Sequence, residues 1–376
     1  MTEKILFCRI MPQECGILQI NKKVGFQLNQ KIKQLPEVLL PWFEQNKREL
    51  PWRKDREPYH VWLSEIMLQQ TRVEAVKGYY ARFLEALPTI EALANCGDDL
   101  LHKLWEGLGY YSRVRNLKKA ANVIMQEHDG VFPRDYAAVR ALPGIGDYTA
   151  GAICSICHDM PIPAVDGNVL RVISRITEDD TPIDSPACKK KVQQMLTEVY
   201  PVRAGDFTQA LMELGATLCG PNWKPRCAEC PCASFCGGNR HGTAEQFPVK
   251  NPKKEKKIQD ITVFIGQCDG KFAIRKRPDR GLLAGLWEFP NVEGKLSVQA
   301  ALSAASALGL HPREVYRQVE RKHIFTHIQW QMTGIYLEAA EESPDFVWLT
   351  PEEIDREAAL PTAFRQFWEE REALEP

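Results

Sequence analysis

Two acidic residues stand out because of the residues that surround them. Glu65 lies in residues 61–73, a mostly apolar stretch whose spacing predicts an amphipathic helix. Burial among apolar side chains disfavours the carboxylate and raises its pKa, which suits a general acid near neutral pH. The pattern alone fits a surface glutamate in a helical salt bridge better. Asp166, in residues 165–169, offers a second, short carboxylate.

The stretch before Asp166 is predicted to be a glycine turn that opens a helix. It runs Leu-Pro-Gly-Ile-Gly-Asp-Tyr-Thr-Ala-Gly over residues 142–151, and Gly144 and Gly146 can adopt positive φ angles. The helix that begins after Ile145 and Gly146 would present free N–H groups and a positive dipole end to an anion such as a DNA phosphate. An ordinary turn between two helices, with Asp166 as a helix cap, explains this stretch nearly as well.

Five of the twelve cysteines lie within residues 219–236. In a reducing compartment such a group binds metal more often than it forms disulfides. Four thiolates close in sequence can hold either an iron–sulfur cluster or zinc. The candidate ligands are separated by seven, two and five residues, and they are Cys219, Cys227, Cys230 and Cys236, with Cys232 as an extra thiol.

The elements that must position these residues change character along the chain. From about residue 31 to residue 203, apolar residues recur at helical spacing between Gly or Pro turns. Clear helical stretches are 90–104, 114–124 and 192–199. Towards the C-terminus the apolar residues recur at every second position, as in strands. The predicted elements there are strands over 261–266, 271–277 and 347–349 and a helix over 298–307.

The expected architecture is multidomain, with an all-α domain followed by a separate α+β domain. A chain of 376 residues is long enough for two or three domains. The expected segments are an N-terminal extension of unclear order (1–30), a helical domain (31–218), a cysteine loop (219–236), a basic linker (237–257) and a C-terminal domain (258–376).

Charge is distributed unevenly between the two halves of the chain. The total is −1, but residues 1–257 carry +5 and residues 258–376 carry −6. A mildly basic front part suits contact with phosphates, although two unrelated domains could differ by as much. No apolar run approaches the length of a membrane span, and Arg9 and Glu14 interrupt any signal-peptide core. We therefore expect a cytoplasmic monomer without a membrane partner.

The glycine turn, with Asp166 downstream, resembles the helix-hairpin-helix of the endonuclease III superfamily of DNA glycosylases. Bifunctional members carry a lysine two positions after the last hairpin glycine, and it forms a Schiff base with the sugar. Here that position is Tyr148, and a phenol cannot form a Schiff base. The resemblance is therefore to the MutY type, the adenine DNA glycosylases, which cleave only the bond between base and sugar.

This resemblance implies roles for the two carboxylates. The segment around Glu65 is similar to the one that carries the family's catalytic acid, which would protonate a ring nitrogen of adenine. Asp166 would stabilise the oxocarbenium-like sugar or attack it transiently, since glycosidic cleavage uses an acid on one side and an anion on the other. Tyr148 and Asn168 would orient these groups, and Gly144, Ile145 and Gly146 would contact the DNA backbone.

The resemblance also nominates residues that contact the bases. Two side chains would enter the base stack after the adenine is extruded, and four would line its pocket. They are Gln70 and Tyr110 in the stack, and Arg53, Glu213, Trp52 and Leu68 at the adenine. Each has an ordinary alternative, since aromatic residues also build cores and glutamates also decorate helices.

The cysteine loop resembles the [4Fe–4S] loop of the same superfamily. Its first gap is one residue longer than usual there, so Cys232 could replace a neighbouring ligand. The resemblance implies that Cys219, Cys227, Cys230 and Cys236 hold a [4Fe–4S] cluster that docks the protein on DNA.

The C-terminal domain resembles a MutT-like (Nudix-like) domain. A Nudix hydrolase binds magnesium through carboxylates, but residues 297–309 contain none, so hydrolase activity is not expected. In the MutY type this domain recognises 8-oxoguanine opposite the adenine. Phe325, Thr326 and His327 occupy the place of the family's Phe-Ser-His loop, and Thr326 retains the hydroxyl.

The expected substrate is double-stranded DNA with adenine opposite 8-oxoguanine or guanine. The expected enzyme is a glycosylase of base excision repair without strong lyase activity, associated with the nucleoid through DNA. Two alternatives remain open. A bifunctional glycosylase for oxidised pyrimidines is disfavoured by Tyr148 and the C-terminal domain, and a non-catalytic DNA-binding protein is disfavoured by Glu65 and Asp166.

Overall fold

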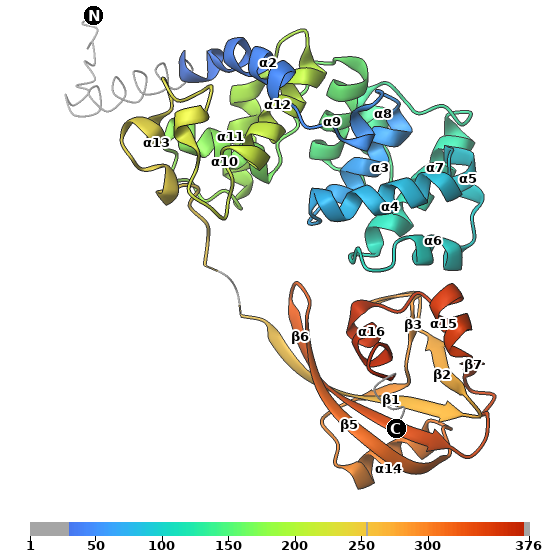
Figure 1. Cartoon of the computed structure of the whole chain (residues 1–376). Coiled ribbons are helices and arrows are strands. Elements are labelled where there is room, and N and C mark those ends of the chain that lie inside the picture. Colours follow the sequence, from blue (N-terminus) through green and yellow to red (C-terminus); the bar gives the residue numbers. More distant parts are fainter. Residues whose placement is uncertain (1–29, 253–254, 372–376) are drawn as a thin grey trace, which may run out of the picture. The chain divides into compact units, whose positions relative to one another are not determined.

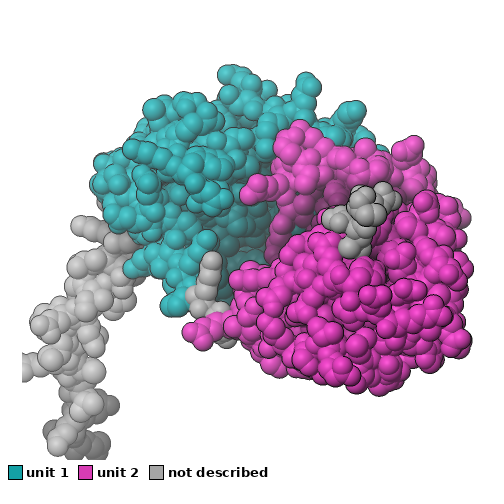
Figure 2. Space-filling view, turned by 60° about the horizontal axis from the view of Figure 1, so that its bottom comes forward, with its two compact units in different colours: residues 1–69, 131–252 teal, residues 70–130, 253–376 magenta. Residues whose placement is uncertain are grey.

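The computed structural model describes residues 30–252 and 255–371, so most of the expected N-terminal extension lies outside it. Two compact units divide the chain (Figure 2). Among the described residues, unit 1 contains 30–69 and 131–252, and unit 2 contains 70–130 and 255–371. This division differs from the domain limits expected from the sequence, which remain a prediction.

Unit 1 is helical (Figure 1). Its longer helices are α2 (Leu35–Asn46), α3 (Pro58–Leu68), α9 (Asp147–His158), α10 (Gly167–Thr177), α11 (Pro186–Thr197) and α12 (Ala204–Thr217). Shorter ones are α8 (Tyr136–Ala141), α13 (Gly237–Arg240), and the 3₁₀ turns η1 (Pro51–Arg53), η2 (Cys227–Glu229) and η3 (Ala244–Gln246). Buried apolar residues of α2, α10 and α12 form one core, including Phe43, Ile173, Phe207 and Leu211.

Side-chain caps fix where several of these helices begin. Asp166 caps α10 by accepting from the Val169 N–H, and Ser185 caps α11 by accepting from the Cys188 N–H. Such caps satisfy N–H groups that have no partner within the helix. The start of α10 is therefore fixed by the same carboxylate that the sequence nominates for chemistry.

The first half of the expected linker is folded. Residues 237–246 form α13 and η3, and α13 packs against α10. A Cβ on Gly238 would lie 3.0 Å from the Arg175 carbonyl oxygen, so a larger residue would require this backbone to shift slightly. The polar and charged composition that predicted a linker therefore fits the residues after 246 better than residues 237–246.

Unit 2 begins with four helices: α4 (Val73–Ala86), α5 (Ile90–Asn95), α6 (Asp98–Leu104) and α7 (Ser112–Glu127). The helix expected over residues 90–104 is split, because the chain is extended at Cys96 and Gly97. Thr89 caps the first piece, and acidic residues Asp98 and Asp99 occupy the first turn of the second.

The rest of unit 2 is built on a seven-stranded sheet with the order β3-β2-β1-β6-β5 along its main path. Its strands are β1 (Lys257–Cys268), β2 (Lys271–Lys276), β3 (Trp287–Glu288), β4 (Asn291–Glu293), β5 (Pro312–Ile324), β6 (Ile328–Ala339) and β7 (Val347–Leu349). Strands β1 and β6 are parallel neighbours over eleven residue pairs. The three predicted strands and the predicted helix are confirmed, whereas β3, β4, β5 and β6 were not predicted.

Helices cover both faces of this sheet (Figure 1). On one face α16 (Thr362–Trp368) buries Phe364, Phe367 and Trp368, while α15 (Pro351–Glu357) contributes Ile354. On the other face α14 (Val298–Ala307) contributes Ala301 and Ala305 to a separate core. The α+β architecture expected for this region is confirmed. No helix among the described residues is long and apolar enough to cross a membrane.

Candidate active site and cysteine site

Glu65 sits in the middle of α3, where its neighbours from Val61 to Met67 are all buried. The Glu65 side chain is itself only 6% exposed. The Tyr148 hydroxyl, on the first turn of α9, donates a hydrogen bond to Glu65 Oε2. The sequence therefore folds so that a carboxyl group is held in an apolar helix with a single phenolic donor.

The electrostatic environment keeps Glu65 protonated up to about neutral pH. Burial raises its pKa from 4.5 to about 7; the Tyr148 hydrogen bond opposes this rise, the Asp166 charge adds to it, and the Arg53 charge opposes it. A carboxyl group with a pKa near 7 can donate a proton at physiological pH and accept one back. The apolar environment of the helix thus gives the group the property that a general acid requires.

Asp166 is held at the start of α10 by donors from its own helix. The Val169 N–H donates to Asp166 Oδ1 over 2.8 Å, and the Asn168 amide donates to Oδ2 over 2.7 Å. Burial raises the pKa of Asp166, while these donors act to lower it. The capping role and the proposed chemical role are compatible, because the cap fixes the carboxylate whose charge acts to raise the pKa of both Glu65 and Tyr148.

Two glycines allow the backbone approaches that place Asp166. A Cβ on Gly151 of α9 would lie 2.6 Å from the Pro163 carbonyl oxygen, so glycine lets the strand-like segment before Asp166 lie against α9. A Cβ on Gly215 of α12 would lie 2.6 Å from the Cβ of Asn168. These positions carry no chemistry of their own, and their importance was not visible in the sequence.

The hairpin before α9 differs in one detail from the expectation. Gly144 has a φ of 78°, but Gly146 has a φ of −96° and forms the N-cap of α9. Only Gly144 therefore needs the left-handed region. Asp147 follows in the first helical turn and pairs with Arg140 over 2.6 Å, and Arg140 also donates to the Ile145 carbonyl over 3.0 Å.

A second buried carboxylate, Glu213 on α12, lies between two arginines. Arg53 donates to Glu213 Oε2 over 2.8 Å, and Arg48 donates through Nε over 2.6 Å and through Nη2 over 3.0 Å. Burial acts to raise the pKa of Glu213, but the Arg48 hydrogen bond and the Arg53 charge outweigh it and hold the pKa low. Arg48 was not predicted as a site residue, although it contacts Glu213 as closely as Arg53 does.

The other unit 1 residues predicted to contact the adenine, Trp52 and Leu68, lie close to Arg48 and Arg53 in the sequence. Trp52, on η1 between Arg48 and Glu65, is 7% exposed, and Leu68, at the end of α3, is half-buried. Arg53 keeps 14% side-chain exposure beside the fully enclosed Glu213 carboxylate. Unit 1 therefore contains both carboxylates of the predicted chemistry and the polar groups predicted for the base.

A buried arginine connects Asp166 to the cysteine loop. Arg171 donates to the Asn168 side-chain oxygen over 2.8 Å and to the Cys219 carbonyl over 2.8 Å. Because Asn168 in turn donates to Asp166, a continuous series of hydrogen bonds runs from this carboxylate to the first cysteine of the loop. Arg171 is 7% exposed, so the series is largely shielded from solvent.

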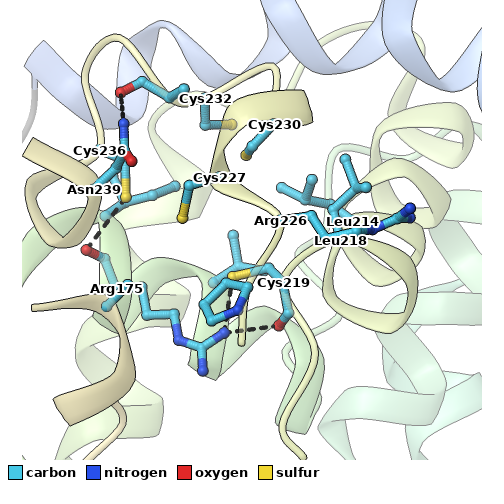
Figure 3. Close-up of a pocket in the computed structure, with 15 residues that line it drawn as sticks. Arg175, Leu214, Leu218, Cys219, Arg226, Cys227, Cys230, Cys232, Cys236 and Asn239 are labelled. Atoms are coloured by element: carbon cyan, nitrogen blue, oxygen red, sulfur yellow. Dashed lines mark hydrogen bonds between the residues drawn. The ribbon is translucent and has the colours of Figure 1, made fainter. Parts of the chain in front are cut away.

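The cysteine loop surrounds a cavity beside α10 and α12. Figure 3 shows the sulfur atoms of the four predicted ligands around a shared space, with Cys232 next to Cys230. Arg175, buried against this site, donates to Cys219 Sγ over 3.2 Å and to the Cys219 carbonyl over 3.0 Å. Apolar side chains complete the lining, including Leu214, Leu218 and Ile176.

The four thiols and the Arg175 donor are compatible with an iron–sulfur cluster. No three metal-ligating side chains within the described ranges converge tightly enough to hold one ion. A four-iron cluster instead needs thiolates spread around a larger apolar space, with N–H donors to sulfur. Arg175 supplies such a donor. The extra thiol, Cys232, is 1% exposed and lies beside Cys230 (Figure 3).

The other predicted residues belong to unit 2. Gln70 and Tyr110 both have positive φ angles, 60° and 49°, and both are exposed. Positive φ is uncommon for such side chains and marks a backbone held under strain. Tyr110 lines a cavity of about 450 Å³ together with Phe325, Thr326 and His327. The Thr326 hydroxyl approaches the Tyr110 hydroxyl at 3.4 Å.

Aromatic packing holds the Phe325 side chain within this loop. Its ring lies 4.5 Å from the His323 ring and 4.9 Å from the Trp330 ring, both at steep angles. These edge-to-face contacts are favourable for aromatic pairs. The structure thus brings the predicted loop residues and Tyr110 to one cavity, while Thr326 and His327 stay exposed at its surface.

Comparison with known proteins matches both halves of the chain. Residues 63–201 match the HhH-GPD superfamily of base excision DNA repair proteins, and residues 262–370 match the NUDIX domain. The human adenine DNA glycosylase is 33% identical over 405 residues, which covers 90% of this chain and 74% of the relative. The chain belongs to the adenine DNA glycosylase family.

A second adenine DNA glycosylase agrees with this assignment, and one solved structure of another DNA glycosylase is similar in fold to part of the chain. The Arabidopsis thaliana family member is 37% identical over 348 residues, covering 77% of this chain. The match covers 55% of that relative, so this chain spans little more than half of its length. A thermostable thymine-DNA glycosylase of known structure matches with a TM-score of 0.51 at 27% identity, covering 57% of this chain and 98% of its own.

Proposed function

We propose that this protein is a monofunctional glycosylase that removes adenine paired with 8-oxoguanine or guanine in double-stranded DNA. The observation that carries the proposal is the pairing of Glu65, whose pKa is about 7, with the capped carboxylate Asp166. One group can give a proton to a leaving base, and the other can stabilise positive charge on the sugar. The protein would act as a monomer in base excision repair.

The proposed reaction hydrolyses the bond between C1′ and N9 of the deoxyadenosine. Glu65 donates its proton to a ring nitrogen, the bonding electron pair leaves with adenine, and C1′ becomes positively charged. Asp166 stabilises this charge or forms a transient ester with C1′. Water then supplies hydroxide to C1′, and its remaining proton returns to the Glu65 carboxylate, which restores the acid.

Recognition of the extruded adenine would use Glu213 together with its partners Arg48 and Arg53. An ionised carboxylate accepts hydrogen bonds from the exocyclic amine of adenine, and guanidinium groups can donate to its ring nitrogens. Glu213 stays ionised because Arg48 and Arg53 face it. Removing a base from the duplex leaves a hole in the stack, which Gln70 and Tyr110 would fill.

The unit 2 cavity would take the base opposite the adenine. It is bounded by Tyr110 and by the exposed loop of Phe325, Thr326 and His327. The Thr326 hydroxyl can donate or accept a hydrogen bond, and the Phe325 ring is anchored by its aromatic neighbours. Recognition of 8-oxoguanine at this cavity would explain a Nudix-like domain whose helix α14 has no carboxylates.

We further propose that Cys219, Cys227, Cys230 and Cys236 hold a [4Fe–4S] cluster. When bound, the cluster would cross-link the loop and would not take part in the glycosidic chemistry. The Arg175 guanidinium would remain directed at the Cys219 sulfur. Free thiols and such a cluster both suit the reducing cytoplasm, where the protein would meet the nucleoid.

The test uses end-labelled duplexes with adenine opposite 8-oxoguanine, guanine or thymine, sampled with and without hot alkali. The expected result is cleavage only after alkali, strongest opposite 8-oxoguanine, because Tyr148 provides no amine for strand scission. Glu65→Gln and Asp166→Asn should each bind the mismatched duplex yet lose most base release. Near-normal release by either variant would contradict its assigned role, and strand cleavage without alkali would restore the bifunctional alternative.

A further inference from the structure

The chain enters the sheet of unit 2 directly beside the loop of Phe325, Thr326 and His327. The first residue of β1, Lys257, pairs with Ile328, the first residue of β6, and the two strands then run parallel. The Lys257 N–H donates to the His327 carbonyl over 3.1 Å. The end of the linker and the loop between β5 and β6 therefore lie next to each other.

Lys256, one residue earlier, contacts the other side of the loop. Its ammonium donates to the Phe325 carbonyl over 2.6 Å. The carbonyls on both sides of Thr326 thus accept hydrogen bonds from two consecutive lysines of the linker, one through a side chain and one through the backbone. The Phe325 N–H closes the turn by donating to the Ile328 carbonyl over 2.8 Å.

These contacts fix the backbone of Thr326 although its side chain is exposed. The Thr326 hydroxyl faces the cavity and approaches the Tyr110 hydroxyl at 3.4 Å. Hydrogen-bond strength falls steeply with misalignment, so a small rotation of this loop would change what the hydroxyl can contact. Lys256 itself is exposed and does not line the cavity, so it can act on a bound base only through the loop.

We propose that Lys256 is a positioning residue for recognition of the opposite base, holding the Phe325 carbonyl so that Thr326 presents its hydroxyl to 8-oxoguanine. This inference rests on the proposed function. Guanine and 8-oxoguanine differ along one edge of the base, so discrimination between them depends on a few aligned hydrogen bonds. Loss of the Lys256 contact would weaken recognition of 8-oxoguanine more than that of guanine.

The competing role for an exposed lysine in a basic linker is contact with a DNA phosphate. Phosphate contacts carry no sequence information, so the loss of one weakens binding to every duplex alike. A positioning role instead changes the ratio between the two mispairs. The two roles are therefore separated by comparing duplexes that differ only in the opposite base.

The experiment uses the full chain with Lys256→Met, Lys256→Arg and, as a matched control in the same linker, Lys250→Met. Single-turnover base release and affinity are measured on duplexes with adenine opposite 8-oxoguanine and opposite guanine. Lys256→Met should lower the ratio of the two release rates, 8-oxoguanine over guanine, by about threefold to tenfold, the range of one net hydrogen bond. Lys256→Arg should restore most of the ratio, and Lys250→Met should leave it unchanged.

An unchanged ratio in Lys256→Met would overturn the proposal, and so would equal losses on both duplexes. Equal losses that also shrink the salt dependence of binding would identify Lys256 as a phosphate contact. The parent protein separates this inference from the proposed function. A parent that releases no adenine disproves the function, whereas a parent that prefers 8-oxoguanine, with a variant that does so equally, disproves only the role of Lys256.

Discussion

Replacing Glu65 by glutamine should remove most base release and, at the same time, stabilise the folded protein at alkaline pH. The carboxyl group is 6% exposed, and burial raises its pKa from 4.5 to about 7. The folded protein therefore binds this proton more tightly than the unfolded chain does. Stability from this group is complete below pH 4.5 and is lost as the pH rises through about 7.

The size of the effect follows from the pKa difference. Each pKa unit corresponds to about 1.36 kcal/mol of free energy. The rise in the Glu65 pKa from 4.5 to about 7 therefore costs the folded state about 3 kcal/mol above pH 7. Glutamine is neutral at every pH, and its amide oxygen can still accept a hydrogen bond from the Tyr148 hydroxyl. Glu65→Gln should therefore raise the free energy of unfolding by about 3 kcal/mol at pH 8 and by much less at pH 5.

The assay is urea unfolding of the parent and variant, followed by circular dichroism at several pH values between 5 and 8. The informative quantity is the difference between the two proteins at each pH, because other groups titrate equally in both. Glu213→Gln is a matched control of opposite sign. Its pKa is lowered by the Arg48 hydrogen bond and the Arg53 charge against the effect of burial, so its ionised form stabilises the fold at pH 8.

Two results would refute this reasoning. A stability difference that is constant between pH 5 and pH 8 would show that the Glu65 proton is not bound more tightly in the folded state. A variant less stable than the parent at pH 8 would show that the carboxylate is stabilised as an anion, as Glu213 is. Either result would also remove the physical basis for Glu65 as the proton donor.

Three further outcomes are expected. Tyr148→Phe removes a hydrogen bond that lowers the pKa of Glu65, so the alkaline limb of single-turnover base release should move up by about one pH unit. Asp147→Asn frees Arg140 from an exposed ion pair beside the hairpin and should tighten binding of duplex DNA by about twofold to fivefold at low salt, measured by fluorescence anisotropy. Arg171→Met breaks the contacts with Asn168 and Cys219. It should lower base release by about tenfold or more, and it should also lower the iron content per protein. If neither quantity falls, these contacts are dispensable.

The helical part of the fold was predictable because its apolar residues repeat at helical spacing. The strands β1 and β2 were predicted from a period of two, although their buried residues in fact form unbroken runs. Strand β5 was not, because it lies at the sheet edge and seven of its thirteen residues are exposed and mostly polar or charged. Its strand character comes from pairing with β6, which no local pattern records.

Site residues were predictable where their own sequence segment indicates a role. They were unpredictable where the role depends on a partner that is distant in the sequence. Glu65 and Tyr148 are 83 residues apart, yet each was nominated by its own segment. Arg48 was missed because its partner, Glu213, is 165 residues away and nothing near Arg48 marks it as buried. Gly146 shows the converse error, since its glycine suggested a positive φ that the helix cap does not require.

The three carboxylates of the unit 1 site show how one chemical group acquires three properties. Glu65 has apolar neighbours and one phenolic donor, so it keeps a proton near neutral pH. Asp166 has a backbone N–H and an amide from its own helix, which favour its ionised form without neutralising its charge. Glu213 has two guanidinium partners and is held as an anion. Glycosidic cleavage needs a proton donor, an uncompensated anion and a fixed hydrogen-bond acceptor, and the partners of each carboxylate determine which of these it can be.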